Sequence, residues 1–242
     1  MFPALVKPNI AYFEQYGFAG LRALKMIISA YQQKGIPVLI DAKRGDIGTT
    51  AGAYAKSLFD FWKADAITVN PYFGHDGVRP FLEYCEKGKG VYILCRTSND
   101  GARDFQDLYT HYNHADSFSI FAGKRLYLQV AQKIVDWKTK FAPQGGVGAV
   151  VGATYPQECE HLSEFFVQSK KEIPLLIPGI GTQGGSPAEV IEILKKTHND
   201  PKIHRINASS SINYAYRHYL TTDYAGAAVK ALKDLNKQIV LG

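Results

Sequence analysis

The sequence contains no long run of apolar residues, and this absence removes a first class of protein. No stretch reaches the about 18 consecutive apolar residues that a membrane-spanning helix needs. The first residues, MFPALVKPNIAYFEQYG, also lack the basic start and apolar stretch of a secretory signal. We therefore expect neither a membrane protein nor a secreted one, and we expect the chain in the cytoplasm.

Cysteine is scarce and scattered. The chain has three cysteines, Cys85, Cys95 and Cys159, and none of them belongs to a Cys-x-x-Cys pair. An odd, dispersed set favours a reducing compartment over a disulfide framework. Because the spacing of zinc ligands is also missing, the sequence predicts no metal site.

Basic residues are in excess, but they are not gathered in blocks. The net charge is +6, yet there is no run of about five or more basic residues. The pairs Lys170-Lys171 and Lys195-Lys196 each end a predicted helix, where positive charge suits the helix dipole. A nucleic acid or a membrane is therefore not an expected partner, and a small anionic substrate remains.

What the sequence does contain is an alternation of short apolar runs and amphipathic segments. Its 242 residues, 46% hydrophobic and 21% charged, suffice for one sizeable core, and we expect a single domain over residues 1–242. We interpret as strands residues 4–6, 38–40, 66–69, 91–94, 147–151, 175–177 and 206–208. Helices are expected at 21–34, 53–62, 77–86, 126–141, 156–170, 187–197 and 224–241, and a long polar and aromatic segment at 98–123.

The seven predicted strands are apolar throughout, as in parallel strands that helices cover on both faces. This pattern fits an open doubly wound α/β sheet or a closed (β/α)8 TIM barrel, and in both folds functional groups gather at the C-terminal ends of the strands. Polar residues follow every run: Lys7 and Asn9, Asp41 to Asp46, Asn70, Arg96 to Asn99, Thr154, Pro178 to Ser186, and Asn207 to Ser211. Polar loops follow strands in any protein. Polar residues after all seven predicted strands nevertheless favour a single polar mouth, that is, one polar opening formed by the C-terminal ends of the strands.

The stretch PVLIDAKRGDIGTT, residues 37–50, carries the densest charge at such a strand end. Strand alternation places Asp41 and Lys43 on the same side, and Asp46 lies just beyond. Buried charges must neutralise one another or serve a ligand. An ion pair that plugs the barrel is one interpretation. Gly45 and Gly48 favour the other, a backbone shaped around a ligand.

Two loops near the C-terminus suggest an anion site. PGIGTQGGS, residues 178–186, lies between a strand and a helix, and its glycines allow backbone N–H groups to face outward. INASSS, residues 206–211, follows the last predicted strand and offers hydroxyls. The loops after the last two strands are the usual phosphate site of these barrels, although both stretches also fit plain tight turns.

Several of these motifs together resemble the orotidine 5′-phosphate decarboxylases. The resemblance rests on KPNIAYFE (7–14), Asp41-x-Lys43-x-x-Asp46-Ile47 and PGIGTQGG, in the branch whose second strand reads KPN-x-x-F/Y-FE. VNPYFG (69–74), LCRTSN (94–99), VVGATYP (150–156) and the last two loops also fit, so the resemblance covers nearly the whole chain.

The resemblance implies decarboxylation of orotidine 5′-monophosphate to uridine 5′-monophosphate without a cofactor or metal. It implies catalytic roles for Lys7, Asp41, Lys43 and Asp46. Lys43 would stabilise the carbanion at C6 and donate the proton, and Asp41 would lie near the leaving carboxylate. Lys7 would hold Asp41 and contact the ribose.

The resemblance also implies substrate-binding roles for Asn9, Ile47, Thr50, Ser98, Pro178, Gly181, Gln183 and Ser210. Ser98 would bond the pyrimidine edge, and Gln183 the phosphate. Asp46, Ile47 and Thr50 would reach into the neighbouring subunit's site, so a homodimer with shared active sites is expected.

Two departures from the family pattern shape these expectations. The family's first strand carries a ribose-binding aspartate and precedes KPN, where this sequence has six residues. We therefore expect a (β/α)8 TIM barrel without its first strand, through truncation, a mis-set start or an unusual barrel. Family members commonly read N-S-S-R-G-I in the last loop, and Ser210 stands at the place of the phosphate-binding arginine. Arg217 or Arg205 is a candidate to replace it.

Alternative functions follow from the same residues. A related enzyme on the Asp-Lys-Asp scaffold would decarboxylate or condense a sugar phosphate with Mg²⁺. A truncated barrel without activity would still bind nucleotides or partners. Fusion to an orotate phosphoribosyltransferase in a longer chain is a further expectation.

Overall fold

The protein folds around one curved parallel sheet. The computed structural model describes residues 3–110 and 124–239. The sheet contains β1 (Leu39–Arg44), β2 (Ala66–Val69), β3 (Gly90–Arg96), β6 (Gly146–Val151), β7 (Leu175–Ile177) and β8 (Arg205–Ile206). These six strands lie in chain order, and every pairing between them is parallel. Because the order never reverses, the sheet winds in one direction, as a barrel does, and the doubly wound alternative is wrong.

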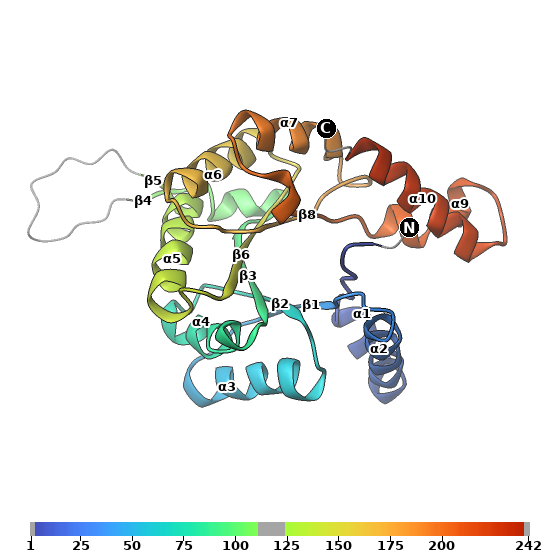
Figure 1. Ribbon diagram of the computed structural model, residues 1–242, viewed down its shortest axis with the longest axis horizontal. Coiled ribbons are helices and arrows are strands. Elements are labelled where there is room, and N and C mark those ends of the chain that lie inside the picture. The colour runs from blue at the N-terminus through green and yellow to red at the C-terminus, as the bar shows by residue number, and fades with distance from the viewer. Residues whose placement is uncertain (1–2, 111–123, 240–242) are drawn as a thin grey trace, which may run out of the picture.

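Helices lie around the outside of this half-barrel (Figure 1). They are α2 (Gly17–Gln32), α3 (Gly48–Lys56), α4 (His75–Leu82), α5 (Leu126–Phe141), α6 (Pro156–Gln168), α7 (Pro187–Lys196) and α10 (Tyr224–Gln238). Shorter helical pieces are α1 (Ala11–Glu14), η1 (Ser57–Phe61), η2 (Cys85–Lys87), η3 (Asp100–Asp104), η4 (Pro201–Ile203), α8 (Ser210–Asn213) and α9 (Ala215–His218). The strands β4 (Tyr109–Thr110) and β5 (Lys124–Arg125) form a separate antiparallel pair.

The two faces of the sheet bury different clusters. Alternate strand residues such as Ile40, Ile67 and Ile93 belong to the large core beneath the helices. Leu39 and Ala66 have the opposite parity and belong to a small second cluster, which also holds Val150 and Leu176. Both faces are therefore largely apolar along the strands, with Asp41 in β1 and Thr68 in β2 as buried polar exceptions.

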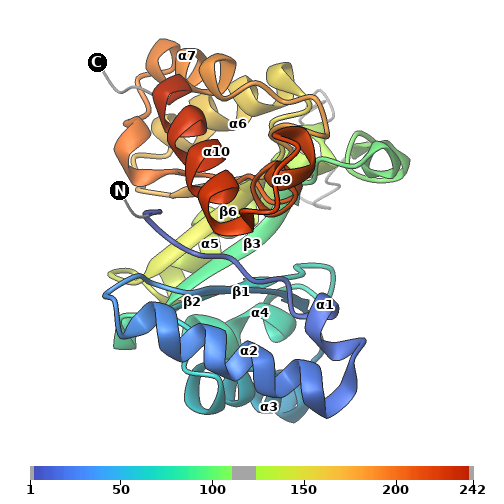
Figure 2. The same ribbon diagram turned by 90° about the vertical axis from the view of Figure 1, so that its right-hand side faces the viewer.

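Residues before β1 lie along its free edge. Val6 and Asn9 form isolated parallel bridges to Val38 and Asp41. Backbone bonds join Val6 N to Pro37 O, Leu39 N to Val6 O and Asp41 N to Pro8 O. Pro8 has no N–H and interrupts the ladder, so the predicted strand 4–6 is reduced to bridges. Figure 2 shows this N-terminal segment crossing the molecule between α10 and α2.

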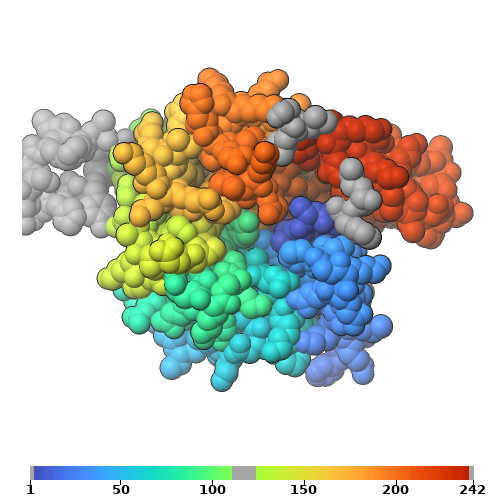
Figure 3. All heavy atoms as spheres, in the orientation of Figure 1, coloured from blue at the N-terminus to red at the C-terminus, as the bar shows by residue number. Residues whose placement is uncertain are grey.

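The space-filling view shows how the two halves of the chain share the surface (Figure 3). The C-terminal residues, coloured red, form the upper right flank, and the N-terminal half, blue to green, forms the lower part. Among the described residues, no helix is long and apolar enough to cross a membrane.

Most predicted elements are confirmed, and three need correction besides the strand expected at 4–6. The strands at 66–69 and 175–177 and the helix at 126–141 have the predicted bounds. The strand expected at 38–40 continues to Arg44, so its charges lie within β1 and not after it. The helix expected at 53–62 begins at Gly48 and ends as a π-helix, and the last strand is shorter and begins at Arg205. Part of the expected segment 98–123 and the end of the helix at 224–241 lie outside the described residues.

Candidate active site

Asp41 lies at the centre of a charged cluster on β1. Lys7 Nζ donates to Asp41 Oδ2 over 2.9 Å, and Lys43 Nζ donates to Asp41 Oδ1 over 2.6 Å. The Asp41 and Lys7 side chains are 8% and 10% exposed, whereas that of Lys43 is 46% exposed. The structure thus brings together three of the four expected catalytic residues, and it leaves the Lys43 ammonium open to a ligand.

The charge state of Asp41 follows from its neighbours. Burial alone would raise the pKa of this carboxyl group. The charges of Lys7 and Lys43 and their hydrogen bonds outweigh burial and lower the pKa of Asp41 from 3.8 to about 2. The cluster therefore holds an ionised carboxylate between two ammonium groups at neutral pH.

Two further residues hold Asp41, and one of them was missed in the sequence. Thr68 Oγ1 donates to Asp41 Oδ1 over 2.8 Å and accepts from Lys43 N over 3.0 Å. Asn9 Nδ2 donates to Asp41 Oδ2 over 3.4 Å. Thr68 is 1% exposed and looks like an ordinary strand residue in AITV. The register that pairs Leu39 with Ala66 brings Asp41 and Thr68 together, two residues further along the two strands, and no local sequence pattern records this register.

The backbone of β1 is irregular where Lys43 lies. The pairing of β1 with β2 shifts register between Ile40 and Arg44, and Lys43 has a φ of +45°. Regular alternation, on which we based the expected juxtaposition, therefore does not hold at this point. Lys43 reaches Asp41 from a left-handed conformation, which is strained for a residue with a side chain.

Asp46, Ile47 and Thr50 lie apart from this cluster. Asp46 Oδ1 accepts from Ile47 N over 2.8 Å. Within the described residues, no hydrogen bond or ion pair joins Asp46 to Asp41 or Lys43. Ile47 is 55% exposed, and Thr50 is exposed at the start of α3. One chain therefore does not place these three residues against the Asp41 cluster.

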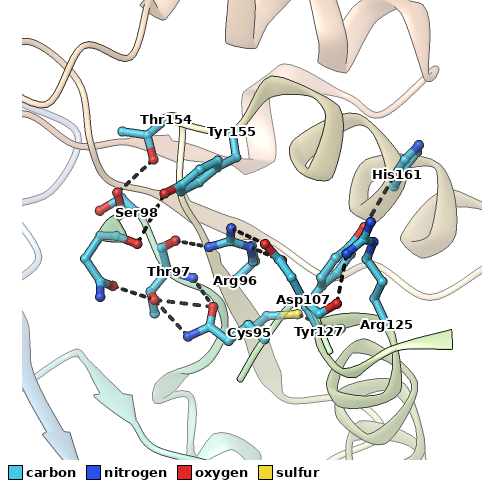
Figure 4. A network of polar contacts seen from close by, with 12 residues as sticks. Cys95, Arg96, Thr97, Ser98, Asp107, Arg125, Tyr127, Thr154, Tyr155 and His161 are labelled. Atoms are coloured by element: carbon cyan, nitrogen blue, oxygen red, sulfur yellow. Dashed lines mark hydrogen bonds and ion pairs between the residues drawn. The ribbon is translucent and has the colours of Figure 1, made fainter. Parts of the chain in front are cut away.

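A buried arginine organises the loop after β3, as Figure 4 shows. Arg96 is fully buried, and its Nε and Nη2 donate to the two carboxylate oxygens of Asp107 over 3.0 and 3.2 Å. Its guanidinium lies 4.0 Å from the ring centre of Tyr155. We expected Arg96 in the polar mouth, but this bidentate pair makes it an anchor that ties residues 97–107 to the sheet.

Ser98 lies where three strand ends converge. Thr154 Oγ1 donates to the carbonyl of Ser98 over 2.8 Å. A Cβ atom at Gly152 would approach Ser98 Cα to 2.7 Å, and one at Gly179 would approach Ser98 Cβ to 3.1 Å. Both glycines are therefore required for close packing, and they fix the position of Ser98 beside the 178–186 turn.

The 178–186 turn is tight and partly paired within itself. Gly179, Gly181 and Gly184 have φ values of +99°, +83° and +92°. Gly184 N donates to Gly181 O over 2.9 Å, and Gly185 N donates to Gly179 O over 3.0 Å, next to Pro178. Gln183 lies close to Gly179, where a Cβ atom would come 3.3 Å from its Oε1. The tight-turn interpretation thus accounts for part of this backbone.

The last loop meets this turn through hydroxyl groups. Thr182 and Ser210 share a hydrogen bond of 3.0 Å between their hydroxyls. Both line a cavity of about 580 Å³, together with Gly181, Ser211, Tyr214 and Arg217. Arg205 is directed elsewhere, because it donates to the carbonyls of Lys202 and His204.

The described residues contain no cluster of three or more His, Cys, Asp or Glu side chains that could hold a metal ion. The three cysteines are free and buried, and burial raises the pKa of the Cys85 and Cys159 thiols to about 12. They are therefore inert thiols at neutral pH.

A parallel half-barrel with charged strand ends and a Gly-rich turn near its last strands is the architecture of barrel enzymes that act on phosphorylated substrates. Comparison with known proteins narrows this class. Residues 3–216 match the family described as Orotidine 5′-phosphate decarboxylase / HUMPS. The chain belongs to this family.

Curated relatives and solved structures agree with this assignment. The orotidine 5′-phosphate decarboxylase of Aromatoleum aromaticum is 42% identical over 234 residues, which cover 96% of this chain and 77% of the relative. That of Halobacterium salinarum is 39% identical over 237 residues, 98% of this chain and 78% of the relative. The OMP decarboxylase structure from Leishmania donovani has a TM-score of 0.73 at 33% identity, covering 97% of this chain and 81% of that one. The UMP synthase structure from the same organism has a TM-score of 0.75 at 35% identity, covering 97% and 46%.

Proposed function

We propose a cofactor-free mechanism for this chain, centred on Lys43 and Asp41. The activity itself is orotidine 5′-phosphate decarboxylase activity, a carboxy-lyase reaction that converts orotidine 5′-monophosphate to uridine 5′-monophosphate. The single observation that supports the mechanism is the ionised Asp41 carboxylate between two lysines, one of which is half exposed.

Decarboxylation breaks the bond between C6 and the carboxylate, and its electron pair stays on C6 as CO2 leaves. No ring carbonyl delocalises this charge well, so the site must stabilise it electrostatically. Lys43 supplies a positive charge beside C6 and then transfers a proton from Nζ to that carbon. Solvent returns the proton to Lys43, since its side chain is 46% exposed.

Asp41 and its partners prepare this step before the substrate binds. The carboxylate fixes the Lys43 ammonium at 2.6 Å and lies near the substrate carboxylate that departs. Lys7 and Thr68 hold Asp41 from the other sides, and Lys7 also contacts the ribose. A preorganised charge of this kind costs no reorganisation in the transition state.

The remaining expected residues bind the substrate away from the reacting carbon. Ser98 bonds the pyrimidine edge from its position between Gly152 and Gly179. Gln183, Gly181 and Pro178 on the turn, with Ser210, bind the phosphate. Asn9 binds the substrate on the ribose side of the Asp41 cluster. Its amide nitrogen already donates a hydrogen bond to Asp41. Binding energy from the phosphate helps to close the site around the ring.

We further propose a homodimer in which Asp46, Ile47 and Thr50 complete the neighbour's site. Their separation from the Asp41 cluster within one chain supports this arrangement. Apolar side chains nearby are also exposed: Ile47 is 55% exposed, Tyr72 88% and Phe73 52%. A second copy of the chain is the partner that would cover them.

The finer features of fold and family are proposals as well. We propose a single domain over 1–242, a (β/α)8 barrel without its first strand, in the KPN branch of the family. The edge formed by Val6 and Asn9, and β8 at the other end of the sheet, support a place for one more strand. Fusion to an orotate phosphoribosyltransferase and a cytoplasmic location remain predictions.

A spectrophotometric assay tests the function. We expect the absorbance of orotidine 5′-monophosphate to change as it is consumed, at the same rate with and without EDTA. Activity that EDTA abolishes would instead indicate the Mg²⁺-dependent sugar-phosphate relative. Binding of uridine 5′-monophosphate without turnover would indicate a barrel that has lost its activity.

A further inference from the structure

The cavity beside the last loop has the size of a small-molecule site but little charge in its walls. It measures about 580 Å³, within the usual range of ligand pockets. Thr182, Ser210 and Ser211 contribute hydroxyls to it. The hydroxyls of Thr182 and Ser210 already bond each other over 3.0 Å. Neutral hydroxyls orient an anion, but they do not balance the charge of a phosphate group.

Arg217 supplies the missing charge. Of the side chains that line this cavity in the described part of the chain, Arg217 alone is a permanent cation. No carboxylate forms an ion pair with it among residues 3–110 and 124–239. A guanidinium group has five N–H donors, and within the described residues only Nε donates, in a 3.1 Å bond to Tyr216 Oη.

Two tyrosines orient this guanidinium. Its central carbon lies 4.7 Å from the ring centre of Tyr214 and 5.6 Å from that of Tyr216. Contact with aromatic faces limits the conformations of a long side chain while leaving the Nη edge open. Arg217 is therefore held in place on the cavity wall, and no described residue accepts a hydrogen bond from its two Nη groups.

We propose that Arg217 is the phosphate-binding cation of this chain and takes the place that Ser210 leaves. The inference rests on the proposed function, because that function places the substrate phosphate at the 178–186 turn. Arg217 reaches the same cavity from α9, seven positions further along the chain than Ser210. The site thereby selects a ribose 5′-phosphate over the corresponding nucleoside.

Binding measurements test this assignment independently of turnover. The probes are uridine 5′-monophosphate, ribose 5-phosphate and uridine, measured by calorimetry on wild type and Arg217→Gln. We expect Arg217→Gln to weaken both phosphates at least tenfold, about 1.4 kcal/mol, and to leave uridine unchanged. The matched control is Arg22→Gln, an exposed arginine on α2, which should change none of the three affinities.

A second variant keeps the test decisive. Adding Ser210→Arg to Arg217→Gln should restore the phosphate affinities, because both positions face one anion. Wild-type affinities in Arg217→Gln, or a loss in Arg205→Gln alone, would overturn the assignment. Phosphate binding that depends on Arg217 in a chain without decarboxylase activity would uphold the inference and refute the proposed function. A wild type that binds neither phosphate would refute the inference.

Discussion

The hydroxyl of Thr68 joins two functional groups on the neighbouring strand: it donates to Asp41 Oδ1 over 2.8 Å and accepts from the backbone nitrogen of Lys43 over 3.0 Å. It therefore fixes both the carboxylate and the irregular backbone from which the lysine extends. Because Thr68 is buried, water cannot replace either bond without a cavity.

Replacing this hydroxyl tests its role. We expect Thr68→Val to lower the free energy of unfolding by about 1–3 kcal/mol, since it leaves the Lys43 backbone nitrogen without its acceptor and removes one of the two hydrogen bonds to Asp41 Oδ1. The turnover number should fall as well, with little change in KM. Thr68→Ser keeps the hydroxyl and should restore turnover. Urea unfolding and steady-state kinetics measure the two effects, and a fully active Thr68→Val would show that Asp41 needs no such support.

Removing the Lys43 ammonium should abolish catalysis. In the proposed mechanism Lys43→Ala loses the positive charge beside C6 and the proton donor, so we expect kcat/KM to fall by at least about a thousandfold. Lys195→Ala, an exposed lysine on α7, is the matched control and should keep full activity. Unchanged turnover in Lys43→Ala would exclude the proposed mechanism while leaving the family assignment intact.

Mixing inactive variants tests the shared active site. Lys43→Ala and Asp46→Ala should each be inactive alone, and a mixture should recover about a quarter of wild-type activity if subunits exchange at random. Recovery follows because each heterodimer has one site with both residues intact. A mixture of Lys43→Ala and Asp41→Asn should recover nothing, since those two residues belong to the same chain's half of the site. Recovery in neither mixture would refute the sharing of residues.

Acid should destabilise the fold through His204. Its Nδ1 accepts from Leu175 N over 2.9 Å, so Nε2 carries the proton and donates to Asn199 Oδ1 over 2.9 Å. Burial lowers the pKa of His204 from 6.5 to about 4. Between these values the unfolded chain binds a proton that the folded chain does not, so stability falls as the pH falls.

The expected loss from this histidine is about 2 kcal/mol between pH 7 and pH 5, measured by urea unfolding at each pH. His204→Gln should reduce the difference between the two pH values, whatever its absolute stability. His198→Asn, at an exposed position, should keep it. The lowered pKa of Asp41 affects the stability of the fold in a separate pH range. The stabilisation that its ionised carboxylate contributes is present above pH 3.8 and is lost as the pH falls toward 2. An equal pH dependence in His204→Gln and wild type would contradict the assignment to His204.

Elements whose bounds follow from a local hydrophobic pattern alone were predictable from the sequence. The run AITV is apolar and bounded by polar residues, so β2 was placed correctly, and the helical period of 126–141 gave α5 its bounds. The start of α3 was not predicted, because it begins at Gly48 and a glycine in the sequence indicates a loop. In the structure Gly48 has a φ of +52°.

The candidate site was predictable only where motifs carried it. Lys7, Asp41 and Lys43 come together as expected, through contacts that the KPN and Asp-x-Lys motifs imply. Thr68 and Arg96 could not be found in this way. The role of Thr68 depends on strand register, and the burial of Arg96 depends on Asp107, a partner on a distant part of the loop. Both depend on tertiary contacts that no local pattern records.

The left-handed backbone at Lys43 has a consequence for how this protein would respond to selection for stability. A φ of +45° is strained for lysine and relaxed for glycine. Lys43→Gly should therefore unfold at a higher urea concentration than Lys43→Ala, although both lack the ammonium. Relief of this backbone strain favours loss of the side chain to which we assign the proton transfer, whereas its ion pair with Asp41 and selection for pyrimidine nucleotide supply oppose that loss.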